Sequence, residues 1–258
     1  MDANLNLRVQ DDTCSRTLGP SSFCRFRILP MPKFSQSNAG ILTEKEADIG
    51  HQARNKIRNE IRQRRRQLSA EQQQQAATDL VKQFQQHQVI FQATHIALYL
   101  HNDGELNTQA VINWCWQQGK QVYIPILHPF SHKHLLFTRL TPDTPLIKNK
   151  YGIDEPKLDV SQVMPYLQLD IVCSPLVAFD QDGNRLGMGG GYYDRTIAQQ
   201  NFIRPGGSAP SIIGLAHDCQ QHHSLPHAPW DMPLTAIITP SKSVIFSSAQ
   251  CRIPPPPN

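Results

Sequence analysis

Two kinds of hydrophobic pattern divide the chain. Near the front, apolar residues recur at roughly helical spacing: Ala53, Ile57, Ile61 and Leu68. This spacing predicts a helix that buries one stripe and ends near residue 68. Ser69 followed by Gln72 fits a capping box, in which each residue satisfies a free backbone N–H of the other. A second helix is therefore predicted from there to about Val89.

Further along, the apolar residues fall in strand-length runs at 95–100, 121–125, 134–140, 170–179, 211–216 and 234–239. Helices are predicted between some of these runs, over 108–118, 161–168 and 190–200. The alternation predicts the α/β class: a three-layer α/β/α arrangement with a mostly parallel or mixed sheet, formed as a single domain over residues 51–246. Such sheets bind ligands at the carboxyl ends of their strands, which singles out the turn at 102–105 and the loop after 170–179.

The two ends of the chain lack a sustained period. Residues 1–50 and the proline-rich tail 247–258 are predicted to be disordered. No window of the 258 residues approaches the roughly 18 to 20 uninterrupted apolar residues of a membrane helix, and the first residues do not resemble a secretory signal. We therefore expect a cytoplasmic protein. The six cysteines form no CxxC pair, so reduced thiols are expected rather than disulfides or a zinc cluster.

The net charge of +4 hides an uneven distribution. Residues 54–66 contain seven basic residues and one acid, Glu60. Within this segment Arg54, Arg58 and Arg62 follow one another at intervals of four, which places them on one face of a helix. Such a row can bind phosphates, and it can equally be a solvated helix face beside a packed stripe.

The segment 179–195, FDQDGNRLGMGGGYYDR, is rich in glycine and lies between a predicted strand and a predicted helix. The backbone N–H groups of its four clustered glycines can converge on an anion at the start of a helix. The spacing matches neither the P-loop nor the GxGxxG dinucleotide motif. Arg185 can neutralise phosphate, a tyrosine can stack on a ring, and Asp194 can share a magnesium ion with phosphates. Together these residue types predict a nucleotide or phosphate site.

GNRLGMGGGYYDR resembles the signature of the 5-formyltetrahydrofolate cyclo-ligase family, also called methenyltetrahydrofolate synthetases. The basic helix, LYLHNDGELNT at 98–108 and WDMPLTAIITPS at 230–241 follow in the family's order, so the resemblance covers about residues 52–246. It implies an α/β/α fold and an enzyme that uses ATP and Mg²⁺ to convert 5-formyltetrahydrofolate to 5,10-methenyltetrahydrofolate, ADP and phosphate. A formamide oxygen is a poor leaving group, so it must first be phosphorylated.

The resemblance also implies roles for individual residues. It assigns catalysis to Arg185 and Tyr192. It assigns ATP binding to Arg54, Arg58, Arg185, Leu186, Gly187, Met188, Gly189, Gly190, Gly191, Tyr192 and Tyr193. It assigns folate binding to Leu100, Glu105, Met188 and Tyr192, and the magnesium ion to Asp194 and Asp231. The family often has a basic residue where this chain has Met188 or Gly190, so Arg185, the backbone and the metal must neutralise more of the phosphate charge here.

Alternatives remain for these residues and for the whole chain. Asp194 can be a helix cap, Asp231 a turn residue and Glu105 a surface acid. The basic helix 54–66 can belong to an RNA-binding protein, although the rest of the chain is slightly acidic. The 11 histidines include no HExxH motif, so a metalloenzyme is not favoured. We expect small-molecule substrates, no nucleic-acid or membrane partner, and a monomer.

Overall fold

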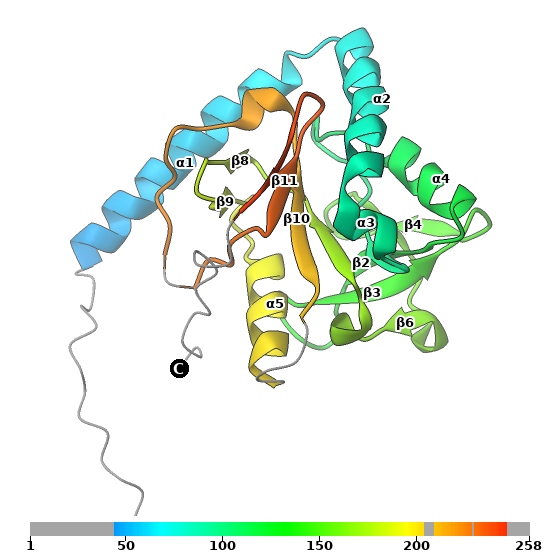
Figure 1. Ribbon diagram of the computed structural model, residues 1–258. Coiled ribbons are helices and arrows are strands. Elements are labelled where there is room, and N and C mark those ends of the chain that lie inside the picture. The colour runs from blue at the N-terminus through cyan, green and yellow to red at the C-terminus, as the bar shows by residue number, and fades with distance from the viewer. Residues whose placement is uncertain (1–43, 204–208, 229, 247–258) are drawn as a thin grey trace, which may run out of the picture. The chain divides into compact units, whose positions relative to one another are not determined.

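A computed structural model describes residues 44–203, 209–228 and 230–246 (Figure 1). Its α-helices are α1 (Glu44–Arg66), α2 (Ala70–Gln86), α3 (Gln88–Gln92), α4 (Gln109–Gln117) and α5 (Tyr192–Ile203). Its 3₁₀ helices are η1 (Val160–Gln162), η2 (Tyr166–Gln168) and η3 (Asp218–Gln220). Its strands are β1 (His95–Ala97), β2 (Gln121–Leu127), β3 (Leu135–Leu140), β4 (Leu146–Lys148), β5 (Asp154–Pro156), β6 (Val163–Met164), β7 (Ile171–Ser174), β8 (Ala178–Phe179), β9 (Arg185–Leu186), β10 (Ser211–Leu215), β11 (Ala236–Ile238) and β12 (Ser243–Ile245).

One large sheet has the strand order β12-β11-β10-β7-β1-β2-β3-β6. The five central strands β11, β10, β7, β1 and β2 run parallel, whereas β12, β3 and β6 pair antiparallel at the two sides. The predicted mixed sheet is thus confirmed. Because the central strands are parallel, their carboxyl ends lie along one edge, where the loops that follow them meet.

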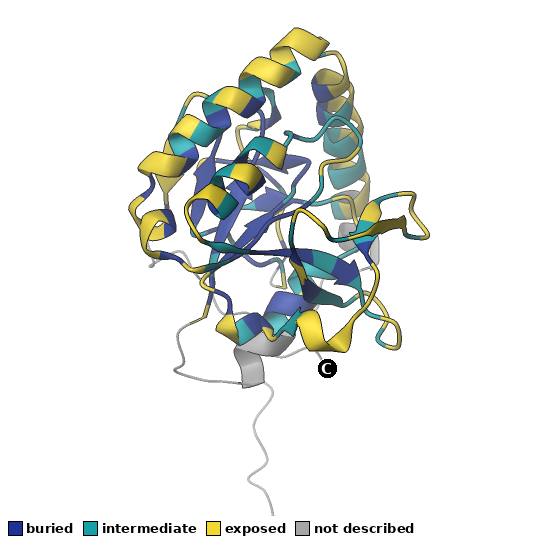
Figure 2. Ribbon diagram, turned by 90° about the vertical axis from the view of Figure 1, so that its right-hand side faces the viewer, coloured by how far each residue is buried: buried dark blue, intermediate teal, exposed yellow. Residues whose placement is uncertain are grey.

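Apolar side chains pack on both faces of this sheet. One cluster joins the sheet to α2, α3 and α4 through Leu80, Phe84, Ile90, Val111 and Cys115. The second cluster joins the opposite face to α5 and contains Ile197. Figure 2 shows the buried strands between helices whose outer surfaces are exposed. The three-layer α/β/α prediction is therefore confirmed, and the cysteines of the described residues are free thiols.

The helix α1 packs through a third, smaller cluster. Ile61 is fully buried there against Leu186 of β9, and Ile57 is partly buried beside it. Ala53, predicted to share this stripe, is exposed. The next position along the stripe, four residues after Ile61, is the fully buried Arg65. The stripe is therefore shorter at its front end than predicted, and it continues through a charged residue.

Several predicted elements have other bounds. The helix predicted over 161–168 is wrong: η1, β6 and η2 stand there, because Pro165 pushes the preceding residue out of the helical region. The run 170–179 is split into β7 and β8 around Pro175, which lacks a backbone N–H. The run 95–100 pairs only as far as Ala97.

The predicted extension at the front of the chain also has a different boundary. α1 begins at Glu44, so residues 44–50 are helical although they were predicted to belong to a disordered extension. Residues 1–43 and the tail 247–258 lie outside the described residues. Within the part of the chain that the structure describes, no helix is long and apolar enough to cross a membrane.

Candidate active site

The glycine-rich loop follows directly after a short β-hairpin. β8 and β9 pair antiparallel, and the Asp180 carboxylate closes the turn between them by accepting hydrogen bonds from the backbone N–H groups of Asp182 and Asn184, each at 3.0 Å. The residues after β9 lead directly into α5. Gly189 and Gly191 have φ values of +96° and +67°, a region that side chains rarely adopt, so glycine is required at both positions. The loop thus brings its backbone to the start of a helix, where an anion can bind.

Arg58 of α1 reaches across to this loop. Its Nε donates a hydrogen bond to the carbonyl oxygen of Gly187 at 2.8 Å. A side chain added at Gly189 would begin 3.5 Å from the Arg58 guanidinium carbon. Partial burial and the neighbouring Arg54 lower the pKa of Arg58, and Asp231 acts in the opposite direction. The basic helix and the glycine loop, 129 residues apart, therefore form one site.

Arg185 is the buried cation of the loop. Its side chain is only 3% exposed, and its Nη2 donates to Oδ1 of Asp194 at 2.5 Å. The guanidinium also lies over the ring of Tyr193, 5.8 Å from the ring centroid. Its Nε has no hydrogen-bond partner within the described residues. A buried cation with a free donor, held by one carboxylate and one aromatic ring, suits an anionic ligand.

The two predicted metal ligands, Asp194 and Asp231, are connected through a hydrogen bond to the backbone. Asp194 Oδ1 accepts a hydrogen bond from the N–H of Met232 at 3.2 Å, and Met232 follows Asp231. Asp231 Oδ2 accepts from the N–H of Ala228 and pairs with Arg54 at 3.2 Å. In each carboxylate, one oxygen is thus held by both an arginine and a backbone N–H. The second oxygen of each carboxylate has no partner in the described parts of the chain. A magnesium ion needs one or two carboxylates plus phosphate oxygens, so this donor set fits it.

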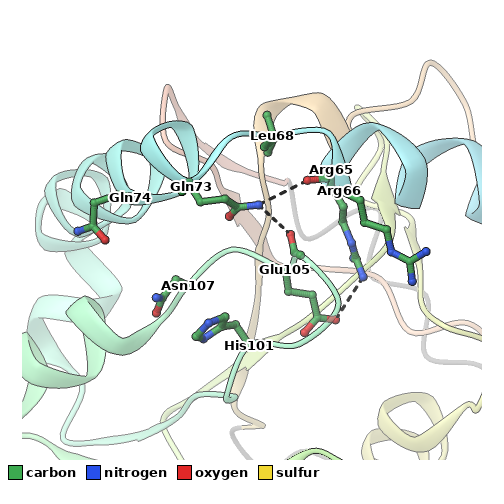
Figure 3. Close-up of a pocket in the computed structure, with 10 residues that line it drawn as sticks. Arg65, Arg66, Leu68, Gln73, Gln74, His101, Glu105 and Asn107 are labelled. Carbon is green, nitrogen blue, oxygen red and sulfur yellow. Dashed lines mark hydrogen bonds and ion pairs between the residues drawn. The ribbon is translucent and has the colours of Figure 1, made fainter.

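A pocket of about 480 Å³ lies between the end of α1, the start of α2 and the loop after β1 (Figure 3). Its charged and polar lining includes Arg65, Arg66, Gln73, His101, Glu105 and Asn107. In Figure 3 the Glu105 carboxyl points toward Arg65, and the closest N···O distance is 4.0 Å. Burial raises the pKa of Glu105 to about 7, and Arg65 counteracts only part of this rise. The pocket therefore holds a carboxyl group that titrates near neutral pH.

Sequence reasoning missed the residues that build the wall of this pocket. Arg65 donates hydrogen bonds to the carbonyl oxygen and to Oδ2 of Asp103, at 2.9 and 3.0 Å, and to the carbonyl oxygen of Leu176 at 3.3 Å. Arg62 and Arg66 bind the same carboxylate of Asp103. The sequence signal for the burial of Arg65 was its position four residues after Ile61, on the same stripe of the helix. The Asp-Gly pair at 103–104 signalled a tight turn, and both residues have positive φ.

The remaining predicted residues have different surroundings. The Tyr192 hydroxyl lies 2.8 Å from the hydroxyl of Tyr151, a residue that the sequence analysis did not select. Met188 is half exposed on the loop, whereas Leu100 packs against the core next to the Glu105 turn. Arg54, Arg58 and Arg62 share a helix face as predicted, yet each has its own partner: Asp231, Gly187 and Asp103 respectively.

The Tyr193 side chain connects the two halves of the site. Its hydroxyl is buried without a hydrogen-bond partner in the described chain. Burial raises its pKa, and the next largest contribution comes from the charge of Glu105. Arg185 acts in the opposite direction. The Tyr193 ring therefore packs against the cation of the loop, and its hydroxyl is affected by the charge of the pocket carboxyl.

Fold and site together define an α/β protein that combines a glycine-rich loop at the start of a helix with a pocket containing a largely buried carboxyl group. The model of the 5-formyltetrahydrofolate cyclo-ligase family matches residues 50–240, about three quarters of the chain, and the chain belongs to this family. It is therefore an enzyme of the cyclo-ligase type, as its resemblance implied.

Several relatives agree with this assignment. The chain is 47% identical over 182 residues to the 5-formyltetrahydrofolate cyclo-ligase of Escherichia coli K12, covering 70% of this chain and 97% of that protein. It is 48% identical over 197 residues to the cyclo-ligase of Haemophilus influenzae, covering 72% and 97%. The solved 5,10-methenyltetrahydrofolate synthetase of Aquifex aeolicus has the same fold, with a TM-score of 0.62 and 23% identity over 75% of this chain and 92% of that chain.

Proposed function

We propose that this enzyme converts 5-formyltetrahydrofolate to 5,10-methenyltetrahydrofolate in a reaction that consumes ATP, requires Mg²⁺ and releases ADP and phosphate. The observation that carries the proposal is the contact of Arg58 with Gly187 at 2.8 Å. It joins the basic helix to the glycine loop, and so combines backbone donors and fixed cations around one anion site. Such a site suits phosphoryl transfer, in which positioning and charge neutralisation are the main tasks.

The chemistry requires two steps. In the first, the formyl oxygen attacks the γ-phosphorus of ATP and ADP leaves, so that the oxygen becomes part of a phosphate ester. In the second, nitrogen 10 attacks the formyl carbon, the ring closes, and inorganic phosphate leaves with the oxygen. Nitrogen 10 loses its proton in this step. The enzyme must therefore hold the folate and the terminal phosphate together, which is catalysis by proximity.

For the nucleotide we propose Arg54, Arg58 and the loop from Arg185 to Tyr193. The loop supplies backbone N–H groups at the start of α5, and Arg185 supplies a buried charge. For the folate we propose Leu100, Glu105, Met188 and Tyr192. Arg185 and Tyr192 are the proposed catalytic residues.

Asp194 and Asp231 are the proposed ligands of Mg²⁺, which would neutralise charge on the ATP phosphates when bound. Arg185 and Arg54 hold these two carboxylates in position through ion pairs. We expect Asp194→Asn to raise the Mg²⁺ concentration for half-maximal activity. The exposed Asp182→Asn serves as control. A Mg²⁺ titration identical to that of the wild type, with an unchanged melting temperature, would remove Asp194 from the metal site.

The absorbance of methenyltetrahydrofolate tests the proposed function directly. Purified enzyme is mixed with 5-formyltetrahydrofolate and Mg²⁺, with and without ATP. We expect product only with ATP. Arg58→Ala should lower kcat/KM for ATP by roughly 10- to 100-fold, since it loses a charge-assisted contact with phosphate. Lys56→Ala, an exposed change on the same helix, should have little effect. ATP-independent product, or equal effects of both substitutions, would contradict the proposal.

The contacts of α1 do not favour the alternative of RNA binding. Arg62, Arg65 and Arg66 all bind Asp103, and Arg64 pairs with Glu60. A helix whose arginines are engaged within the fold offers little free charge to a polyanion. The cytoplasm and the monomeric state stay predictions, which fractionation and light scattering would test.

A further inference from the structure

Two tyrosines meet at the rim of the glycine loop. Tyr192 is the first residue of α5, whereas Tyr151 lies in the turn between β4 and β5. Their hydroxyl oxygens lie 2.8 Å apart, and their rings meet edge to face with centroids 6.2 Å apart. Tyr151 is nevertheless 56% exposed. The turn of the small two-stranded sheet therefore reaches the proposed active site and contributes an accessible aromatic surface there.

Three cationic residues, Lys133, Lys150 and Arg195, are associated with this pair. The Nζ atom of Lys150 lies 5.2 Å from the ring centroid of Tyr151. The hydrogen bond with Tyr192 and the charges of Lys150 and Lys133 lower the pKa of Tyr151. Arg195 follows Tyr192 by three residues on α5, so the two side chains occupy neighbouring positions on one face of that helix. The two rings thus lie in a locally positive field.

Lys133 is held at this rim by the backbone around it. It lies in the turn between β2 and β3 with φ of +62°, a conformation that a residue other than glycine adopts only where the surroundings impose it. Two residues later, the N–H of Leu135 donates to the hydroxyl of Thr196 at 3.0 Å. That hydroxyl donates to the carbonyl oxygen of Tyr192 at 2.8 Å. The turn that contains Lys133 is therefore tied to the start of α5.

None of these three cations has a carboxylate partner within the described residues. Arg195 binds only the carbonyl oxygen of Gly190, at 2.9 Å. The acids of the adjoining hairpin are engaged elsewhere: Asp154 pairs with Lys148, and Glu155 accepts a hydrogen bond from the Asn149 amide. Lys133 and Lys150 are both exposed. The rim is thus an accessible cluster of positive charge beside aromatic rings, a combination that suits a carboxylate attached to an aromatic group.

We infer that Lys133, Lys150 and Arg195 bind the carboxylates of the glutamyl portion of the folate substrate, while Tyr151 and Tyr192 flank its aminobenzoyl ring. This inference rests on the proposed function, which supplies a folate as substrate. A folate has its carboxylates at one end and the reacting pterin at the other. Among the other proposed folate contacts, Glu105 is acidic and lies in a pocket, so it would repel the carboxylates. The cations of the exposed rim complement the negative charge of the carboxylate end of the folate.

The test compares three folate substrates with two single variants and one double variant of the full chain. The folates are 5-formyltetrahydropteroate, which lacks glutamate, and 5-formyltetrahydrofolate with one or with three glutamates. The variants are Lys133→Gln and Lys150→Gln, alone and combined. Lys148→Gln is the matched control, because Lys148 lies on the same hairpin but is paired with Asp154. KM is measured for each folate and for ATP, at low and at high salt.

We expect the double variant to raise KM for the triglutamate about tenfold. Each lysine contributes a factor of roughly three, which is typical of one exposed charge pair. KM for the monoglutamate should rise less, and KM for the pteroate should not change. High salt should reduce the difference between wild type and variant. An equal rise for all three folates would overturn the inference. A rise in KM for ATP alone would assign these cations to the nucleotide phosphates instead.

The wild-type enzyme separates this inference from the proposed function. If it forms no methenyl product from any folate, the proposed function fails. Calorimetric titration of the same folates then still tests the rim, because carboxylate binding does not depend on turnover. Equal dissociation constants for the pteroate and the triglutamate would overturn the inference in that case also.

Discussion

At the residue scale, Glu105 offers the clearest pH-dependent behaviour. Burial raises the pKa of this carboxyl from 4.5 to about 7. Below pH 4.5 the folded and unfolded states are both protonated, and the shift has no effect on stability. As pH rises from 4.5 to 7, the unfolded chain loses its proton first, so the free energy of unfolding falls. Above pH 7 the ionised Glu105 lowers the free energy of unfolding by its full amount, about 3 kcal/mol by linkage.

Glu105→Gln removes this cost while keeping an oxygen for the N–H of Asn102. We therefore expect the variant to gain stability over the wild type as pH rises from 5 to 8, measured by urea unfolding at each pH. Asp143→Asn, a change of an exposed acid, should show no such trend. If the difference in the free energy of unfolding between Glu105→Gln and wild type stayed constant with pH, the Glu105 carboxyl would ionise normally. The same variant should impair folate use if the proposed assignment of Glu105 is right.

At the scale of elements, α1 is held in place by its buried arginine. Arg65 connects the helix to the loops after β1 and β7 through Asp103 and Leu176. Arg65→Met would leave the Asp103 carboxylate with fewer partners, and the backbone carbonyl oxygens of Asp103 and Leu176 would each lose a donor. We expect a loss of roughly 3 kcal/mol in the free energy of unfolding, typical of breaking a buried ion pair.

The matched control for this helix is Arg64→Ala, which removes an exposed pair with Glu60. Exposed pairs of this kind contribute less than about 1 kcal/mol. Urea unfolding of both variants measures the difference. If Arg65→Met were as mild as Arg64→Ala, the other contacts of α1 would be sufficient to hold the helix in place.

At the scale of the whole molecule, the site is assembled from segments far apart in the chain. α1 supplies Arg58, the loop after β9 supplies the glycines, and the segment before β11 supplies Asp231. A ligand that binds this assembly should therefore stabilise all three segments together.

We expect ATP with Mg²⁺ to slow amide hydrogen exchange both in residues 54–66 and in 185–195, as measured by mass spectrometry. The exposed hairpin of β4 and β5 should respond to folate rather than to ATP, according to the role inferred for Tyr151. Protection by ATP that is confined to the glycine loop would show that α1 does not share the nucleotide site. ADP provides the control, since it lacks the γ-phosphate.

Much of the site could be predicted because its residues carry local signals. The glycines of 187–191 are needed for backbone geometry, and Arg185 and Asp194 lie in the same short segment. The capping box of Ser69 and Gln72 is formed as predicted. Tyr151 and Lys133 gave no such signal, because their importance comes only from the side chains that face them across the fold. The helix predicted over 161–168 failed because its apolar residues resembled a period that Pro165 prevents.

The sequence alone determined the α/β class, the order of most elements, the glycine loop and the family resemblance, because these depend on local periodicity and on contiguous motifs. Only the tertiary structure decided which partner each arginine of α1 binds, that Arg65 is buried, and that Tyr151 reaches Tyr192. These facts depend on long-range contacts, which no local pattern encodes. The raised pKa of Glu105 belongs to the same group, since burial is a property of the whole fold.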